Sequence, residues 1–184
     1  YKCVVIDPGS DPDGILEMLD KLSLHPVAVI CTHGHFDHIG GVFGLQERYE
    51  IPFYLNKKDY PLVKRANLYQ LVSQSKIAIK IPKNFTDLTE HRVIMVDELE
   101  FEVLDTPGHT DGSVCIRVEN SLFTGDTIVA KKAGRFDMVG GNENALSLSI
   151  KKLVRVLPGS ITCYGGHGEP FKLKSLRINA LSES

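Results

Sequence analysis

The sequence predicts an α/β protein, and three observations support this prediction. Short runs of apolar residues alternate with longer segments whose apolar residues recur at helical spacing. Most of the short runs end in turn-forming residues such as Gly, Pro and Asp. Histidine and aspartate side chains are concentrated directly after several of these runs, as expected where sites form at strand ends in layered α/β proteins.

The N-terminal part is expected to contain three strands and three helices. A β-branched run at residues 4–6 predicts a strand, because the turn sequence Asp7-Pro8-Gly9 follows it. Five consecutive apolar residues at 27–31 predict a strand that is buried on both faces. A third short strand is expected at 53–55. Helical spacing of apolar residues predicts helices over residues 14–24, 40–49 and 59–73.

The C-terminal part is expected to be richer in strands. Glu119-Asn120 separates two apolar runs and predicts a hairpin of strands over 113–118 and 121–124. A helix is expected over 146–157, where Pro158-Gly159 ends an amphipathic pattern. Further strands are predicted at 93–96, 99–104 and 161–164, whereas residues 74–92 show no clear pattern and are expected to form a flexible cover. Because no repeat or low-complexity linker interrupts the chain, we expect residues 1–184 to form a single domain.

Composition narrows the classes of protein to which the chain can belong. Its 184 residues suffice for one domain with a substantial core, and 42% hydrophobic with 24% charged residues is typical of a soluble globular protein. The formal net charge is −2 and no basic stripe is present, so we expect no nucleic-acid partner. No apolar stretch reaches about 18 residues and no signal peptide is visible, so we expect a cytoplasmic protein without a membrane partner. The sequence does not distinguish a monomer from a homo-oligomer.

The four cysteines are expected to be buried free thiols in a reducing compartment. None forms a C-x-x-C pair, and three of them lie in apolar, strand-like runs. A disulfide is an alternative that the spacing does not support. A thiolate metal ligand is a weaker alternative, because no cysteine lies at a turn beside the histidines. The cysteines are Cys3, Cys31, Cys115 and Cys163.

The segment Thr-His-Gly-His-Phe-Asp-His at residues 32–38 carries the strongest functional signal. It places four side chains that can bind a metal within six positions. Three further candidates follow at wide intervals, each at a glycine-marked turn after an apolar run. Imidazole and carboxylate groups of this kind suit zinc, iron or manganese. The seven candidate ligands are His33, His35, Asp37, His38, His109, Asp126 and His167.

Metal binding explains this concentration better than chance placement does. Three imidazoles and a carboxylate crowded into one turn would lose water without a compensating partner, and a bound cation removes this penalty. Taken alone, Asp126 is also consistent with an ordinary turn aspartate. A single tetrahedral zinc takes about four ligands. Five imidazoles and two carboxylates are therefore too many for one ion and suit two divalent ions, with zinc expected first and iron or manganese as alternatives.

The motifs T-H-G-H-F-D-H, T-P-G-H-T, T-G-D-T and G-G-H-G, in this order, resemble those of the metallo-β-lactamase superfamily. Within it, the sequence is most similar to the glyoxalase II branch, the hydroxyacylglutathione hydrolases. The resemblance extends from Asp7-Pro8-Gly9 to Gly168-Glu169-Pro170, nearly the whole chain. It implies a four-layer αββα sandwich with the metals at one edge of the two sheets. The family opens with two more strands before the D-P-G turn, so these N-terminal strands are expected to be missing here.

The resemblance also implies a role for each ligand. His33, His35 and His109 correspond to the ligands of the first metal, and Asp37, His38 and His167 to those of the second. Asp126 corresponds to the residue that bridges both metals together with a hydroxide. The resemblance therefore implies that Asp37 and Asp126 are catalytic, acting with a metal-bound hydroxide that attacks a carbonyl carbon. β-Lactamases of the family often carry cysteine or serine in place of this aspartate, so Asp126 points away from lactam hydrolysis.

A small-molecule thioester such as S-lactoylglutathione is the expected substrate, because a thiolate with a pKa of about 8.5 leaves without strong acid assistance. Arg135 keeps a positive charge that suits a substrate carboxylate, and a structural ion pair is an equal alternative. Asp7 and Thr110 are candidates to orient the ligating imidazoles, although a plain turn role for Asp7 is equally consistent. A helical glutathione-binding domain like that of glyoxalase II is not expected, since the chain ends 17 residues after His167.

A persulfide dioxygenase of the same superfamily is the main alternative. Such enzymes resemble the chain at these motifs but use a single iron, held by residues that correspond to His33, His109 and Asp126. A non-catalytic metal-binding module is a further alternative, and the intact ligand set argues against it. Metal content separates the two enzymes, since one binds two metals and cleaves a thioester and the other binds one iron and consumes oxygen.

Overall fold

The computed structural model describes residues 1–68 and 79–176 of the chain. The chain divides into two compact units, Tyr1–Glu90 and His91–Ser184. Each unit combines strands with helices, so the α/β class predicted from the sequence is confirmed. The organisation of residues 1–184 as a single domain stays a prediction.

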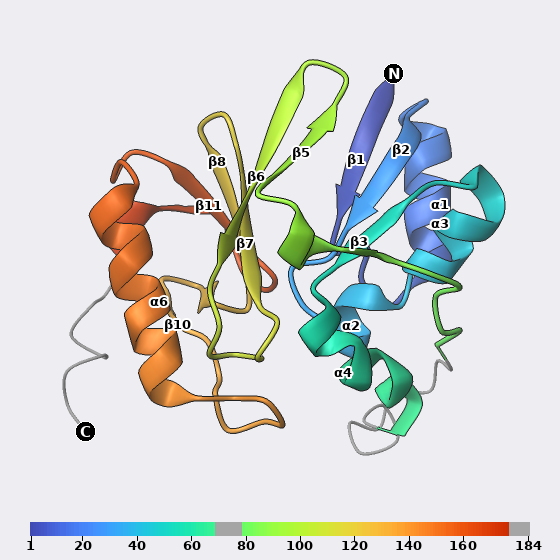
Figure 1. Ribbon diagram of the computed structural model, residues 1–184. Helices are drawn as coiled ribbons and strands as arrows, with labels where there is room; N and C mark the ends of the chain where they lie inside the picture. The colour runs from blue at the N-terminus through green and yellow to red at the C-terminus, as the bar shows by residue number, and fades with distance from the viewer. Residues whose placement is uncertain (69–78, 177–184) are drawn as a thin grey trace. The chain divides into compact units, whose positions relative to one another are not determined.

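A four-stranded parallel sheet forms the centre of the first unit (Figure 1). In spatial order its strands are β1 (Lys2–Ile6), β2 (His25–Ile30), β3 (Phe53–Leu55) and β4 (Thr86–Asp87). The first three confirm the predicted strands, and the apolar run at 27–31 supplies the buried core of β2. The sequence does not predict β4, because a strand of two residues leaves no periodicity.

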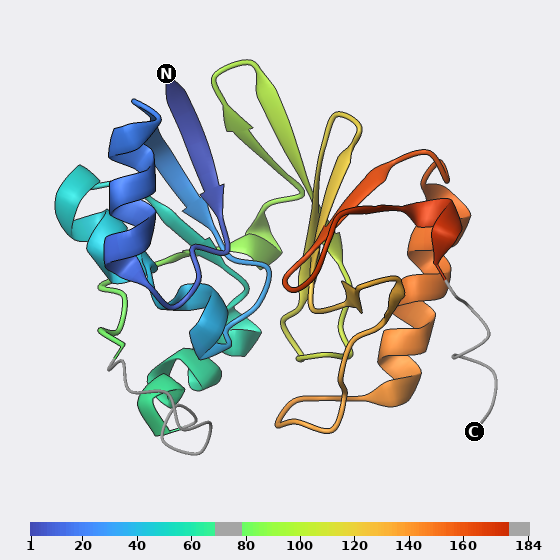
Figure 2. The same ribbon diagram turned by 180° about the vertical axis from the view of Figure 1, so that it is seen from behind.

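Helices flank this sheet and follow the ends of its strands. They are α1 (Pro12–Lys21), α2 (Phe36–Ile39), α3 (Val42–Tyr49) and α4 (Tyr60–Lys64), with the 3₁₀ turns η1 (Lys57–Asp59) and η2 (Leu88–Glu90). The α1 helix begins where the Asp11 carboxylate accepts a hydrogen bond from the Gly14 N–H at 3.0 Å. In Figures 1 and 2, α1 and α3 lie side by side on one face of the sheet. Leu19 and Leu45 from these helices join a core that includes Phe53 of β3.

The helix predicted over residues 40–49 corresponds to α3, which begins two residues later, at Val42, after the short helix α2. The reason is a close approach of two backbone segments. A Cβ atom at Gly40 would lie 2.7 Å from the Cα of Ser10, and one at Gly41 would lie 2.9 Å from the Cβ of Pro8. Because both positions are glycine, the backbone after the Asp-Pro-Gly turn can pack closely against the residues that join α2 to α3.

Two predictions fall partly outside the described residues. The helix predicted over 59–73 corresponds to α4, and residues 69–73 are not described. The cover predicted over 74–92 includes residues 74–78, which are not described either. The described remainder of that segment contains β4 and η2, and its predicted flexibility stays a prediction.

A six-stranded sheet forms the centre of the second unit. In spatial order its strands are β12 (Phe171–Lys172), β11 (Thr162–Gly165), β8 (Ser121–Gly125), β7 (Val114–Val118), β6 (Leu99–Asp105) and β5 (Val93–Val96). Neighbours from β5 to β8 are antiparallel, whereas β8 and β11 are parallel. The predicted hairpin is confirmed, and its turn residue Glu119 adopts a positive φ of 49°. A separate two-stranded ribbon, β9 (Ile128–Val129) with β10 (Lys132–Ala133), is too short to be predicted.

The α6 helix (Glu143–Val156) covers one face of the six-stranded sheet (Figure 2). It begins at Asn142, whose side chain accepts from the Ala145 N–H at 2.9 Å. Leu146, Ile150 and Leu153 are at most 1% exposed in a core shared with strand residues, and η3 (Leu173–Ser175) closes the same core. Each such side chain contributes about 1.5–3 kcal/mol relative to exposure. Among the residues described, no helix combines the length and apolar character that crossing a membrane requires.

The prediction that the cysteines are free thiols is confirmed. Cys31, Cys115 and Cys163 are buried, and Cys3 is half-buried. Burial raises the pKa of the Cys31 thiol well above its usual value and that of Cys163 to about 11. Both thiols therefore stay protonated near neutral pH.

Candidate metal centre

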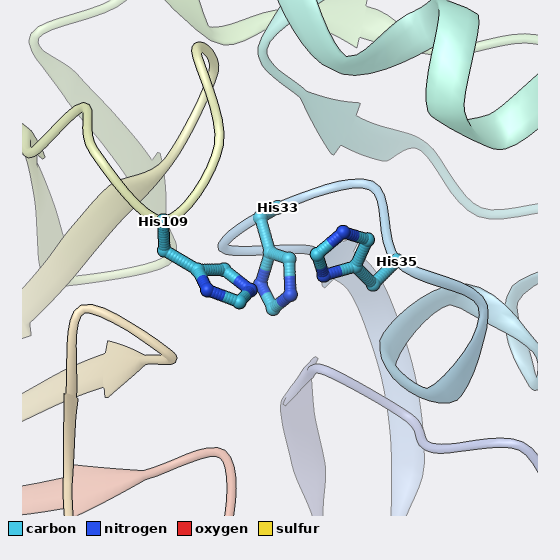
Figure 3. Close-up of side chains that lie close together, drawn as sticks. All are labelled: His33, His35 and His109. Carbon is cyan, nitrogen blue, oxygen red and sulfur yellow. The ribbon is translucent and has the colours of Figure 1, made fainter. Parts of the chain in front are cut away.

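Each predicted ligand follows a strand, as expected from the sequence. The four ligands at residues 33–38 come directly after β2 and continue into α2. His109 follows β6, Asp126 follows β8, and His167 follows β11. Figure 3 shows His33 and His35, which come from the loop after β2, and His109, which comes from the loop after β6.

Within residues 1–90, three imidazole rings form a buried cluster. His33, His35 and His38 are 1%, 7% and 2% exposed. The ring centroids of His33 and His35 lie 4.8 Å apart in an edge-to-face arrangement, and those of His33 and His38 lie 4.0 Å apart. Asp37 is more exposed, and its carboxylate lies 3.9 Å from Nε2 of His38. All four side chains of the sequence cluster therefore share one small volume.

The Asp7 carboxylate lies next to two of these rings, one directly and one through Thr32. The Thr32 hydroxyl donates to Asp7 Oδ2 at 2.7 Å, so its oxygen is left to accept from His33 Nδ1 at 3.1 Å. Asp7 Oδ2 also lies 3.0 Å from Nδ1 of His38. Because Nδ1 of His33 donates to the Thr32 oxygen, the lone pair of a neutral His33 ring is on Nε2. Asp7 thus contacts His38 directly and His33 through Thr32, and its role in supporting metal ligands stays a prediction.

Within residues 91–184, a backbone carbonyl fixes the tautomer of His109. Nδ1 of this buried ring lies 2.7 Å from the carbonyl oxygen of Arg135. A carbonyl only accepts hydrogen bonds, so Nδ1 must carry the proton, and the lone pair of the neutral ring is on Nε2. The preceding residue, Gly108, has a φ of 138°, and a Cβ atom there would overlap the backbone of Leu146 at the start of α6. The T-P-G-H loop therefore rests on the first turn of α6.

The Asp126 carboxylate lies close to two histidines of this unit. Asp126 Oδ2 lies 3.7 Å from Nε2 of His109 and 3.6 Å from Nε2 of His167. The His109 side chain is 2% exposed, that of Asp126 15% and that of His167 55%. The predicted ligands of this unit, which are up to 58 positions apart in sequence, are therefore neighbours in space.

A glycine contact fixes the backbone that carries Asp126. A Cβ atom at Gly134 would overlap the carbonyl oxygen of Asp126, and the Gly134 N–H donates to the Thr127 carbonyl at 3.1 Å. The Thr127 hydroxyl lies 3.1 Å from that of Thr106 at the end of β6. These contacts tie the loop of Asp126 to the strand that precedes His109.

Arg135 and Thr110 make contacts within their own loops. The Arg135 guanidinium forms two 3.0 Å hydrogen bonds to the Asp137 carboxylate, and both side chains are mostly exposed. These hydrogen bonds raise the pKa of Arg135 and lower the pKa of Asp137. Thr110 is buried, and its hydroxyl lies 2.7 Å from that of Ser113. The predicted substrate contact of Arg135 and supporting role of Thr110 stay predictions.

The donor chemistry of both units fits a divalent metal. A carboxylate oxygen of Asp126 and the Nε2 lone pair of a neutral His109 would repel each other at 3.7 Å. A cation bound by both atoms turns this repulsion into attraction. In the first unit, Nε2 of His33 and both ring nitrogens of His38 are buried, so water does not solvate them freely. Imidazole and carboxylate donors of this kind suit zinc, iron or manganese.

Three supporting groups were not identified from the sequence. Thr32 links His33 to Asp7, and the carbonyl of Arg135 orients His109. Asp59 accepts a hydrogen bond from the Gly34 N–H at 2.9 Å and is 1% exposed. Thr32 directly precedes the histidine motif, so its role could have been predicted from the sequence. The Arg135 carbonyl could not, because every residue has one, and Asp59 could not, because it is 25 positions from Gly34 in the sequence.

A profile of the metallo-β-lactamase superfamily matches residues 2–167 of the chain. An uncharacterised protein of Aquifex aeolicus is 34% identical over 90% of the chain and 78% of its own length. The probable metallo-hydrolase YqgX of Bacillus subtilis is 30% identical over 91% of the chain and 80% of its own length. A hydroxyacylglutathione hydrolase of Nitrosomonas europaea is 34% identical over 89% of the chain, which spans 54% of that enzyme. These relatives support a metal-dependent hydrolase.

Solved structures agree with this grouping. TTHA1623 in a di-iron-bound form is 32% identical, with a TM-score of 0.83 over 95% of the chain and 85% of that protein. The B3 metallo-β-lactamase BLEG-1 is 29% identical, with a TM-score of 0.87 over 99% of the chain and 90% of that protein. The predicted α/β fold of the metallo-β-lactamase type is thereby confirmed.

Proposed function

Because the chain belongs to the metallo-β-lactamase superfamily, we propose that it is a dinuclear-metal hydrolase that cleaves a small-molecule thioester. The observation that carries the proposal is the tautomer of His109, which the Arg135 carbonyl fixes so that Nε2 faces the Asp126 carboxylate. An imidazole locked in this way, beside a carboxylate, is prepared to bind a cation rather than to exchange protons with water.

The proposed ligand set draws on both units. His33, His35 and His109 would hold one metal, and Asp37, His38 and His167 would hold the other. Asp126 would contribute to both and, with Asp37, is the proposed catalytic carboxylate. The TTHA1623 structure with two irons supports two ions per chain and keeps iron beside zinc and manganese as the native metal. When bound, such ions lower the pKa of a coordinated water and polarise a carbonyl oxygen.

The chain's own residues prepare this chemistry by holding donor atoms in place. The Asp7 carboxylate and the Thr32 hydroxyl keep the Nδ1 proton of His33 engaged, and the Arg135 carbonyl does the same for His109. Buried supports of this kind limit reorganisation of the donor atoms during the reaction. A hydrolytic metal centre requires metal-binding atoms that are held in fixed positions, and these contacts hold them in that way.

A thioester is favoured over an amide because of its leaving group. A thiolate derived from a thiol with a pKa of about 8.5 departs without a strong general acid. A relative named hydroxyacylglutathione hydrolase supports an acyl-thiol as the substrate. S-lactoylglutathione is therefore the first substrate to test, with the thiol carrier left open. The four free thiols suit the reducing cytoplasm, which we propose as the location of the protein.

The test combines elemental analysis of the purified protein with three assays. We expect two metal ions per chain and hydrolysis of S-lactoylglutathione or a related acyl-thiol. One iron per chain with oxygen uptake on glutathione persulfide would identify the persulfide dioxygenase instead. Hydrolysis of a chromogenic β-lactam alone would favour the activity named for BLEG-1.

The Asp126→Ala variant tests the shared ligand. We expect it to abolish hydrolysis and to lower the metal content, because the carboxylate faces both His109 and His167. Asp137→Ala, which removes a mostly exposed carboxylate from the same unit, is the matched control and keeps both metals. Activity retained by Asp126→Ala with less than one metal per chain would contradict the bridging role.

A further inference from the structure

Two carboxylates hold the backbone on either side of His33. Asp7 Oδ1 accepts from the Thr32 N–H at 2.8 Å, and Asp59 Oδ2 accepts from the Gly34 N–H at 2.9 Å. Both amides that flank His33 are therefore anchored by carboxylate oxygens from distant parts of the chain.

Asp59 also approaches the loop through its backbone. A Cβ atom at Gly34 would lie 2.8 Å from the Asp59 carbonyl oxygen and 2.9 Å from the Asp59 Cβ. Glycine at this position therefore lets the loop rest directly on the end of η1. That turn is itself held, because the Asn56 side chain accepts from the Lys58 N–H at 3.1 Å and the Asp59 N–H donates to the Asn56 carbonyl at 3.0 Å.

Burial indicates that the Asp59 carboxylate has a specific task. It is 1% exposed, and a buried carboxylate is costly unless hydrogen bonds stabilise it. The hydrogen bond from the Gly34 N–H is such a stabilising contact, and an asparagine oxygen at this position could accept the same hydrogen bond. The carboxylate accepts a hydrogen bond from the N–H of Gly34, the residue that separates His33 from His35 in the sequence. Through this amide, Asp59 can influence where the two imidazoles lie.

We propose that Asp59 is a positioning residue that sets the separation and orientation of His33 and His35 by holding the Gly34 amide. It acts through hydrogen-bond geometry rather than through its charge. This inference rests on the proposed metal centre only in taking His33 and His35 as ligands. It requires no turnover, so it is tested by binding of cobalt(II) alone.

The experiment titrates the full chain with cobalt(II) and follows the visible absorption that reports the coordination geometry. Asp59→Ala removes the acceptor, and we expect it to weaken cobalt binding 10–100-fold, the usual effect of losing a group that orients a ligand. Asp59→Asn keeps an acceptor oxygen, and we expect affinity and spectrum within threefold of the parent protein. If Asp59→Ala does not fold, Asp59→Val takes its place, because it keeps most of the bulk without an acceptor.

Asp11→Ala is the matched control, because it also removes a carboxylate that accepts from a backbone N–H, at the start of α1. It lowers helix stability and leaves cobalt binding unchanged. Parent-like cobalt binding by Asp59→Ala would overturn the proposal. Equal weakening in Asp59→Asn and Asp59→Ala would also overturn it, since charge and not geometry would then be responsible. A protein that binds cobalt as expected but hydrolyses no thioester would contradict the proposed function and leave the role of Asp59 intact.

Discussion

In residues 1–90, two carboxylates hold the backbone beside His33 in addition to the close contact at Gly34, whereas in residues 91–184 the donor side chains are held by backbone groups and glycines. In the first unit, Asp7 and Asp59 bind the amides on either side of His33. In the second unit, the Arg135 carbonyl orients His109, and Gly134 fits against the backbone of Asp126. Ligands adjacent in sequence need side chains from elsewhere to arrange them, while ligands on separate loops are arranged mainly by how the backbone packs.

This difference predicts which kinds of substitution destabilise each unit most. Removing a carboxylate in the first unit takes away hydrogen bonds but leaves the backbone path intact. Adding a Cβ atom in the second unit forces the backbone itself to move. We therefore expect glycine substitutions in residues 91–184 to have larger effects than carboxylate substitutions in residues 1–90.

The largest effect is expected for Gly134→Ala. The added Cβ would overlap the carbonyl oxygen of Asp126, so the loop must shift, at a cost of roughly 3–5 kcal/mol in the free energy of unfolding. Urea denaturation measures this loss. Gly140→Ala is the matched control, because Gly140 has a φ of 85° but no neighbour closer than 3.4 Å to an added Cβ. The control should lose only about 1–2 kcal/mol from left-handed strain, and equal losses would show that overlap at Gly134 is not the cause.

A smaller effect is expected for Asp7→Ala. It removes two hydrogen bonds from Thr32 and the contact with His38, so we expect a loss of about 2–3 kcal/mol in the free energy of unfolding. Cobalt(II) affinity should fall 10–100-fold, because the ring of His33 loses its support. Asp7 has a φ of 48°, which asparagine tolerates, so Asp7→Asn keeps the backbone path and is the control. Cobalt affinity unchanged in Asp7→Ala would show that carboxylate support in the first unit is dispensable.

A still smaller effect, and one that depends on pH, is expected at Asp87. Burial alone would raise the pKa of this carboxyl, but hydrogen bonds from Thr89 and Lys57 outweigh it and lower the pKa to about 2. A carboxyl whose pKa is lower in the folded state stabilises the protein above its unfolded pKa of about 3.9, and this stabilisation is lost as the pH falls towards the folded value. Asp87→Asn should therefore cost about 1–2 kcal/mol at neutral pH, allowing for partial solvent screening.

Urea unfolding of the parent and Asp87→Asn at several pH values checks this prediction. The difference between the two proteins should be constant from pH 7 to about pH 5 and should shrink between about pH 4 and pH 2. A difference that does not change with pH would mean that the charge of Asp87 contributes nothing and only its shape matters.

The smallest effect is expected for Arg135→Ala. The backbone carbonyl that orients His109 remains in this variant, and an exposed ion pair such as that with Asp137 adds little to stability. Cobalt affinity should stay within threefold of the parent value. A rise in KM confined to substrates that carry a carboxylate would support the predicted substrate contact. A large loss of metal would instead show that the side chain is needed to hold the carbonyl in place.

The sequence predicts the main strands well, and it predicts that the candidate ligands follow strands, for a physical reason. Apolar runs such as residues 27–31 form buried strands wherever they occur, and polar residues after them must lie at strand ends. The sequence does not predict very short elements such as β4, because two residues show no periodicity. It does not predict where α3 begins either, because this depends on the close approach of Ser10 to Gly40, a contact between distant parts of the chain.

Among the groups that hold the candidate ligands in place, some can also be predicted from the sequence and others cannot. Asp7 is predictable because it ends a strand and lies beside the turn that the motif requires. Asp59 and the Arg135 carbonyl are not, because one lies 25 positions from Gly34 and the other is a backbone atom that every residue possesses. Tertiary contacts of this kind are visible only once the chain is folded.

The most direct test of the account is a crystal structure of the full chain grown with zinc or iron, with diffraction recorded at the absorption edge of that metal. We predict two anomalous peaks per chain, with His33 and His35 from one unit and His109 and Asp126 from the other coordinating the same pair of ions. A metal coordinated by residues of one unit alone, with the donors of the other unit facing solvent, would contradict the account.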